Sequence, residues 1–149
     1  MAVIVVSNCL LGCDCRYKGD NCRCERILEL AKEHTIIAVC PEQMGGLSTP
    51  RDPAERVKDK VISNKGRDVT EQYRKGSEAA LFLTKLNKAD FAILKYRSPA
   101  CGKGMIYDGT FEGKLVPGNG VFAEMLLENG IPFYSENELD DLPVFKKTE

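Results

Sequence analysis

Residues 2–7, AVIVVS, decide the fold, because they form a short, continuous run of apolar residues that are mostly β-branched. A run of this kind is typical of a strand buried on both faces, as in a parallel sheet. Three later runs have the same character, and apolar residues at helical spacing lie between them. The predicted strands are residues 2–7, 35–40, 90–96 and 131–135, and the predicted helices are at about residues 22–33, 70–87 and 119–128.

Strands that alternate with helices predict an α/β protein with a mainly parallel sheet. We expect one domain over residues 1–149, with three α/β/α layers and a Rossmann-like sheet of about four strands. We expect Pro41 to end the second predicted strand. We expect Leu86 to lie on or near the buried side of the second predicted helix. A turn signal at residues 64–66 and a Gly-containing stretch at 107–111 predict two short β-hairpins outside this sheet.

The charges of the chain almost cancel, with 21 Lys and Arg against 22 Asp and Glu and a formal net charge of −1. This balance argues against a nucleic-acid partner, because non-specific binding needs a broad basic field. No run approaches the ~20 apolar residues of a membrane span, and the first residues lack the basic region of a signal peptide. The single histidine, His34, follows the first predicted helix and receives no catalytic role.

Seven cysteines are the unusual feature of the composition. Their odd number and a chain long enough to fold without cross-links argue against a secreted disulfide scaffold. We therefore expect a cytoplasmic protein whose cysteines serve metal, iron–sulfur or thiol chemistry.

Three cysteines far apart in the sequence belong to one edge of the predicted sheet. Cys9 follows the first strand, Cys40 ends the second, and Cys101 lies in the loop after the third. The carboxyl ends of parallel strands meet at one edge, where ligands bind. Thiolates select zinc, copper(I) or iron–sulfur clusters. Three ligands suit a cubane cluster that leaves one iron open, or a metal with one exchangeable site. The alternative is that these are free cysteines of the core.

Four further cysteines form two Cys-x-Cys pairs in the segment that follows the first strand. They are Cys13, Cys15, Cys22 and Cys24. The spacing matches no standard zinc finger or ribbon. A second metal site, disulfides formed in air and a flexible thiol-rich loop all remain open.

Polar residues flank the cysteine trio. Glu42, two residues after Cys40, can move a proton or activate water, and Ser98, three residues before Cys101, can orient a substrate. A solvated carboxylate and a turn-capping serine are the alternatives. Three basic residues can supply positive charge to an anionic ligand or to a reduced cluster, with ordinary surface residues as the alternative. They are Arg16, Arg51 and Lys95.

Longer motifs connect these residues. They are SNCLLG (7–12), CRY (15–17), VCPEQ (39–43), TPR (49–51), GRDVT (66–70), SPACG (98–102), IYDGTF (106–111) and GNGV (118–121). Together they resemble the DUF523 family, which includes the 2-thiouracil desulfurases. The resemblance covers about residues 5 to 136. It is to the members of that family that have a single domain.

The resemblance implies a [4Fe–4S] cluster held by Cys9, Cys40 and Cys101, sensitive to oxygen and replaceable by another metal in air. It implies a desulfurase that exchanges C=S for C=O in a thiolated pyrimidine without redox change, with Glu42 and Ser98 handling protons and substrate. Cluster-assembly machinery is the implied protein partner. The further candidates for contact with substrate or an anion are Arg16, Tyr17, Arg51, Lys95 and Asp108.

Two other functions stay open at this point. One is a non-catalytic metal- or cluster-binding protein that acts as a sensor or store. The other is a small-molecule binder at the helix N-terminus near Gly120, where free backbone amides can bind an anion.

Overall fold

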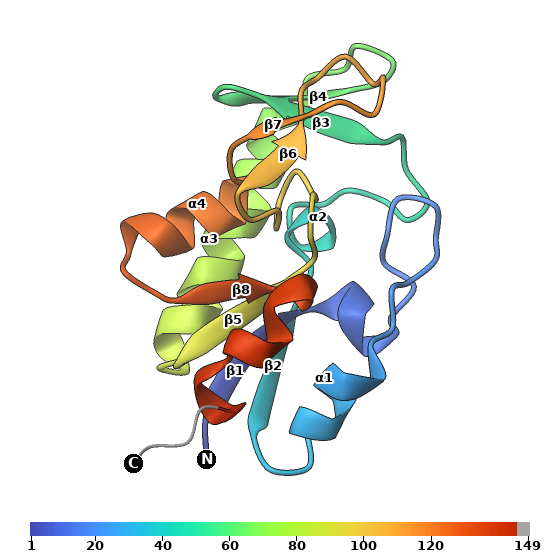
Figure 1. Ribbon diagram of the computed structural model, residues 1–149. Coiled ribbons are helices and arrows are strands. Elements are labelled where there is room, and N and C mark those ends of the chain that lie inside the picture. Colours follow the sequence, from blue (N-terminus) through green and yellow to red (C-terminus); the bar gives the residue numbers. More distant parts are fainter. Residues whose placement is uncertain (146–149) are drawn as a thin grey trace.

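The sheet at the centre of the molecule has four parallel strands in the order β2-β1-β5-β8. This computed structural model describes residues 1–145. The strand bounds are β1 Val3–Ser7, β2 Thr35–Val39, β5 Phe91–Leu94 and β8 Phe133–Ser135. The predicted α/β class with a parallel sheet of four strands is therefore confirmed (Figure 1).

Successive side chains of each strand point to opposite faces of the sheet, so the core consists of two apolar layers, one on each face. Val5 packs with Tyr73 and Phe122 on one face, whereas Ile4 and Ile27 belong to the other. Two helices cover the first face, and a short helix with two 3₁₀ turns covers the second (Figure 1). The covering elements are α3 Thr70–Leu86 and α4 Val121–Glu128 on the first face, and α1 Glu25–Leu30, η2 Glu136–Asp141 and η3 Pro143–Phe145 on the second.

The chain leaves the central strand β1 towards β2 on one side, and β5 pairs with β1 on the other. This change of direction makes the carboxyl ends of β1, β2 and β5 the place where an open α/β sheet binds ligands. Short helices follow two of these ends, the 3₁₀ helix η1 Asn8–Leu11 after β1 and α2 Pro41–Met44 after β2.

Two antiparallel hairpins lie beyond this edge of the sheet, at the top of Figure 1. Glu55 joins them, because its Oε1 accepts hydrogen bonds from the backbone N–H groups of Gly109 at 2.9 Å and Phe111 at 3.1 Å. The hairpin strands are β3 Ala54–Val57 with β4 Lys60–Ser63, and β6 Met105–Tyr107 with β7 Leu115–Pro117.

Two details of the sequence-based prediction are wrong, and one is incomplete. Pro41 does end the strand, but it also begins helix α2, where a proline suits the first position because its missing N–H has no helical acceptor. Leu86 is 63% exposed, because it lies on the outward face of α3 together with Phe82, four residues earlier, which is equally exposed. The first hairpin turns at Lys58 and Asp59, between the paired Val57 and Lys60, and residues 64–66 form a separate turn after β4.

Helix α2 packs against α3 at backbone contact, and two glycines allow this. A Cβ atom on Gly76 would lie 1.7 Å from the carbonyl oxygen of Pro41, and one on Gly45 would lie 1.9 Å from that of Gln72. Movement of a side chain cannot relieve either clash, because the atoms that a Cβ would meet belong to the backbone. The close approach therefore fixes the position of the helix that carries Glu42.

We expect Gly76→Ala to destabilise the protein. Alanine in a helix is normally favoured over glycine by roughly 0.5–1 kcal/mol, but overpacking a filled site costs roughly 1–3 kcal/mol, so the clash with Pro41 decides the sign. Urea unfolding under reducing conditions measures the change. Lys75→Ala, at the exposed neighbouring position of the same helix, is the control. Equal stability of the two variants would contradict the backbone contact.

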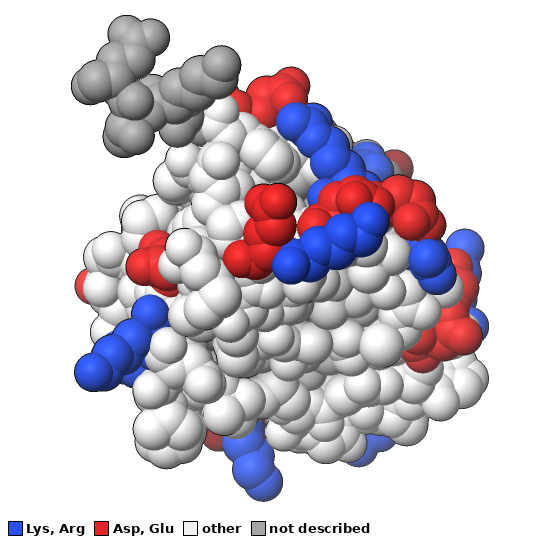
Figure 2. All heavy atoms as spheres, turned by 90° about the horizontal axis from the view of Figure 1, so that it is seen from below, with Lys and Arg blue, Asp and Glu red and all other residues white. Residues whose placement is uncertain are grey.

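The face of the molecule that is seen from below carries both signs of charge. On the face shown in Figure 2, acidic and basic side chains lie next to one another and neither sign forms a continuous field. Within residues 1–145, none of the helices combines the length and the apolar character needed to cross a bilayer.

Candidate functional site

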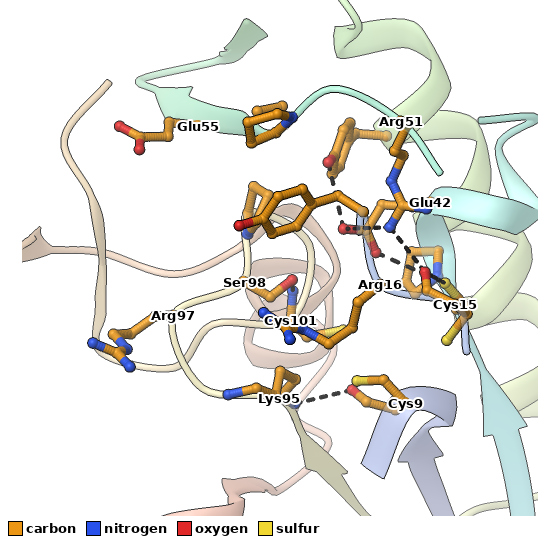
Figure 3. Close-up of a pocket in the computed structure, with 18 of the residues that line it drawn as sticks. Cys9, Cys15, Arg16, Glu42, Arg51, Glu55, Lys95, Arg97, Ser98 and Cys101 are labelled. Atoms are coloured by element: carbon orange, nitrogen blue, oxygen red, sulfur yellow. Dashed lines mark hydrogen bonds and ion pairs between the residues drawn. The ribbon is translucent and has the colours of Figure 1, made fainter. Parts of the chain in front are cut away.

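A cavity of about 390 Å³ opens at the carboxyl ends of β1, β2 and β5. This volume lies in the range of small-molecule sites. Its walls come from separate parts of the chain, which Figure 3 shows converging. These parts are residues 7–9, 15–17, 39–42, 51–55 and 95–99, with Tyr73, Cys101, Tyr107, Phe111 and Gly113.

Four of the seven cysteines line this cavity. Cys9, Cys40 and Cys101 do so as the strand pattern predicts, and Cys15 joins them from the loop after η1. All four are buried, with exposed fractions between 3% and 9%. The sequence grouped Cys15 with Cys13, Cys22 and Cys24, and its place beside Arg16 and Tyr17 was the signal that set it apart from them.

The four thiols influence each other. The pKa of the Cys15 thiol rises to about 12, because a hydrogen bond with Cys40 lowers it but one with Cys9 and burial raise it by more. The pKa of Cys40 is raised by its hydrogen bond with Cys15 and by burial, and that of Cys101 is raised chiefly by burial. Cys15, Cys40 and Cys101 are therefore protonated without a metal, and ligation of a metal by any of these thiols would release its proton.

The arrangement of the thiols suits a group larger than one ion. Within residues 1–145, no three His, Cys, Asp or Glu side chains are placed to hold a single metal ion. The cysteines instead line the walls of a cavity, and a polynuclear group can span such walls. Iron–sulfur clusters, which are held by cysteine thiolates, are groups of this kind.

Glu42 is held by two partners beside the thiols. Its Oε2 lies 3.6 Å from Nη2 of Arg51 and accepts a hydrogen bond from the Tyr73 hydroxyl at 3.4 Å. Its Oε1 lies 3.9 Å from Sγ of Cys40. Burial raises the pKa of Glu42, and Arg51 opposes this shift. A buried carboxyl group with a raised pKa, in a cavity, is typical of a proton-transfer residue.

Arg51 also fixes the loop that carries Cys15. Its Nη2 donates to the carbonyl oxygen of Cys15 at 3.1 Å, and its backbone N–H donates to that of Tyr17 at 2.8 Å. The Arg51 and Glu42 side chains are only 8% and 13% exposed. This ion pair therefore joins the segments after β1 and β2.

We expect Arg51→Met to lower the free energy of unfolding by about 3 kcal/mol, because it leaves a buried carboxylate without its partner. Urea unfolding of the metal-free, reduced protein measures this loss. The double variant Glu42→Gln/Arg51→Met should lose less unfolding free energy than the sum of the losses in the two single variants. We expect the difference, which is the interaction energy of the pair, to be roughly 0.5–3 kcal/mol. Strict additivity would show that the pair does not interact.

Ser98 shapes the turn that presents Cys101. Its Oγ accepts hydrogen bonds from the backbone N–H groups of Ala100 and Cys101, both at 3.1 Å. Ser98 therefore caps the turn, as the alternative interpretation of the sequence predicted. It also lines the cavity. Since the oxygen accepts from the backbone, its own proton can be donated into the cavity.

The remaining candidates fall into two groups. Arg16, Tyr17 and Lys95 line the cavity; Arg16 pairs with Asp20 at 3.1 Å, and Nζ of Lys95 pairs with Glu136 at 2.8 Å. Asp108 is absent from the cavity wall, and its Oδ1 caps the hairpin turn by accepting from Thr110 at 2.9 and 2.6 Å.

Several residues of the wall were not predicted from the sequence, and three of them carry polar or charged groups. Tyr73 comes from α3, Glu55 from β3, and Arg97 from the loop after β5, where its guanidinium lies 5.2 Å and 5.7 Å from the rings of Tyr96 and Tyr107. Only the placement of these segments in three dimensions identifies them. Position next to the SPAC motif was the one signal available for Arg97.

The other cysteines and the α4 N-terminus are not part of this wall. Cys13 is exposed, and Cys22 and Cys24 pack against the apolar layer of the second face. The first amides of α4 are already bonded: Gly120 donates to Gly102 at 2.8 Å, and Val121 donates to Pro99 at 2.9 Å. The predicted anion site near Gly120 therefore lacks free donors.

Comparison with known proteins agrees with this geometry. A family model described as 2-thiouracil desulfurase matches residues 4–138. The uncharacterized protein YbbK of Bacillus subtilis (strain 168) is 43% identical over 150 residues, which are 94% of this chain and 99% of that protein. The solved structure of the [4Fe-4S]-dependent thiouracil desulfidase TudS is 41% identical, covers 97% of each chain and superposes with a TM-score of 0.92.

Proposed function

Because the chain belongs to the 2-thiouracil desulfurase family, we propose that it is an enzyme that replaces the sulfur of a small thiolated heterocycle by oxygen. The substrate class is a 2-thiouracil-like base. The reaction C=S + H₂O → C=O + H₂S transfers no electrons to or from an outside partner. We assign it to one domain over residues 1–149 and to a [4Fe–4S] cluster.

Cys9, Cys40 and Cys101 would hold the cluster. The main support is that these three buried thiols come from the ends of β1 and β2 and the loop after β5 and line one cavity with Glu42. When bound, the cluster supplies an iron with an open coordination position, a Lewis acid suited to a soft sulfur atom.

Glu42 is proposed as the residue that moves protons. Its position beside Cys40 and its raised pKa favour a carboxyl group that takes a proton from water and returns one to the departing sulfur. Arg51 and Tyr73 hold its Oε2, so that Oε1 stays directed towards the thiols.

Ser98 and the remaining wall would orient the heterocycle. The Ser98 hydroxyl can donate to a ring oxygen or nitrogen, and Tyr17 offers an aromatic surface. Arg16, Arg51 and Lys95 supply positive charge to an anionic form of the base. We also propose a cytoplasmic location with cluster-assembly proteins as partners, because free thiols and an oxygen-sensitive cluster need a reducing compartment.

The test is anaerobic reconstitution followed by a product assay with 2-thiouracil. We expect iron and acid-labile sulfide to be bound, and uracil and sulfide to form in equal amounts. Bound iron with no turnover of any thiolated base would support the second function class, a cluster-binding protein without catalysis. An absence of iron after reconstitution would reject both.

A further inference from the structure

Phe111 has a backbone conformation that a bulky residue rarely adopts. Its φ angle is 61°, in the left-handed region where glycine is the usual residue. It belongs to the loop between β6 and β7 and lines the cavity together with Tyr107 and Gly113. Residues in strained conformations gather at ligand-binding sites, where surrounding contacts hold them. The strain at this part of the wall therefore indicates a role in the site.

The loop that carries Phe111 is held against the β3–β4 hairpin, beside which it lies in Figure 1. Oε1 of Glu55 accepts hydrogen bonds from the backbone N–H groups of Phe111 and Gly109. Glu55 is itself only 9% exposed and lines the cavity, where Figure 3 labels it. A Cβ atom on Gly109 would collide with the side chain of Val57, so the loop and β3 are in close contact. These contacts fix the strained residue before any ligand is bound.

The phenyl ring of Phe111 contributes little to the folded core. It is 36% exposed, and within residues 1–145 it belongs to neither of the two apolar layers. Burial of apolar surface stabilises a fold roughly in proportion to the area removed from water. Core packing therefore does not explain why a large apolar residue occupies a strained position. A ligand in the cavity would remove more of this ring from water.

A flat heterocycle in the cavity has two kinds of surface to be recognised. Its polar atoms lie on the edge of the ring, and the proposed function assigns Glu42 and Ser98 to atoms on this edge. Its faces carry no hydrogen-bonding groups, and aromatic side chains stack on such faces. Phe111 is an aromatic residue of the wall that the proposed function leaves unused.

We propose that Phe111 is a specificity-determining residue whose ring stacks on the face of the thiolated heterocycle. This inference rests on the proposed function. Phe111 forms and breaks no bond, so it contributes to the affinity for the substrate and not to the chemical step. The site then favours flat aromatic rings over thiocarbonyl compounds that are saturated or open-chain, because these lack a π face for stacking.

The test compares the reconstituted wild type with Phe111→Ala and Phe111→Tyr, and with Phe82→Ala as the matched control. Phe82 is 63% exposed on α3 and is not part of the cavity wall. KM and kcat are measured for 2-thiouracil and for dihydro-2-thiouracil, whose ring is not aromatic.

We expect Phe111→Ala to raise the KM for 2-thiouracil by roughly 5- to 150-fold, the range of base–aromatic stacking. The kcat and the bound iron should stay unchanged, because stacking acts equally on the ground state and the transition state. The KM for dihydro-2-thiouracil should change little. Phe111→Tyr, which keeps an aromatic face, should retain most of the affinity, and Phe82→Ala should match the wild type.

Urea unfolding of the metal-free, reduced protein is a second readout that does not depend on the cluster. Phe111→Gly removes the same ring as Phe111→Ala but suits the positive φ angle. We expect the glycine variant to unfold at a higher urea concentration than the alanine variant, although alanine is normally the more favourable of the two residues. Both variants should show the same rise in KM.

An unchanged KM in Phe111→Ala, or an equal rise for both substrates, would overturn the proposal and leave the proposed function intact. An alanine variant more stable than the glycine variant would also overturn it, because the ring would then not be held in the left-handed conformation. A wild type that binds iron but converts neither substrate would be a failure of the proposed function. Equilibrium dialysis of 2-thiouracil against the same proteins then decides the role of Phe111, and equal affinities would overturn it.

Discussion

Glu42→Gln is expected to retain the iron of the wild type and to lose desulfuration by roughly 10²- to 10⁴-fold, the usual contribution of a positioned acid or base. Glutamine keeps the shape of the side chain and can still accept from the Tyr73 hydroxyl, but it cannot take a proton from water. Uracil formation from 2-thiouracil, measured per bound cluster, gives the comparison.

Glu71→Gln is the matched control for this variant. Glu71 lies in the exposed first turn of α3, and its carboxylate pairs with Arg74 at 3.0 Å. It should keep wild-type turnover. If Glu42→Gln also works within a few-fold of wild type, another group handles the proton and the assignment of Glu42 is wrong.

Cys101→Ser is expected to lose nearly all the iron, and with it all activity. The residue is 3% exposed and sits in a turn that is fixed by Ser98 and by the N-terminus of α4. A serine hydroxyl is a harder ligand that iron–sulfur clusters disfavour. Iron and sulfide analysis after reconstitution should find about four irons in the wild type.

Cys9→Ser and Cys40→Ser should behave in the same way, whereas Cys13→Ser should keep its iron. Retention of full iron content by any one of the three variants would remove that cysteine from the ligand set. Loss of iron in Cys13→Ser would show that the exposed loop contributes to the cluster.

The sequence predicted the sheet and much of the cavity because both depend on local pattern. Runs such as residues 2–7 define buried strands, and the topology then brings Cys9, Cys40 and Cys101 to one edge. The family resemblance read from the motifs is confirmed by the match over residues 4–138. The ligand and catalytic roles of the individual residues remain predictions.

The features that the sequence did not predict depend on contacts between segments far apart in the chain, which local sequence patterns do not reveal. Helix α2 has only four residues, and its position depends on the contact between Pro41 and Gly76. Tyr73 reaches Glu42 across the same helix pair. Asp108 belongs to a motif, yet its carboxylate is used for a turn, so membership of a motif did not by itself place a residue in the cavity.

The segments that form the cavity wall are far apart in the sequence, and this bears on whether folding or cluster insertion comes first. Segments from Ser7 to Cys101 must meet before three thiols face one space, and closing such long loops in an unfolded chain is entropically unfavourable. A zinc finger, by contrast, gathers its ligands within a short segment and folds as the metal binds. We therefore expect this polypeptide to fold before the proposed cluster is inserted, so that the cluster is delivered to a folded protein.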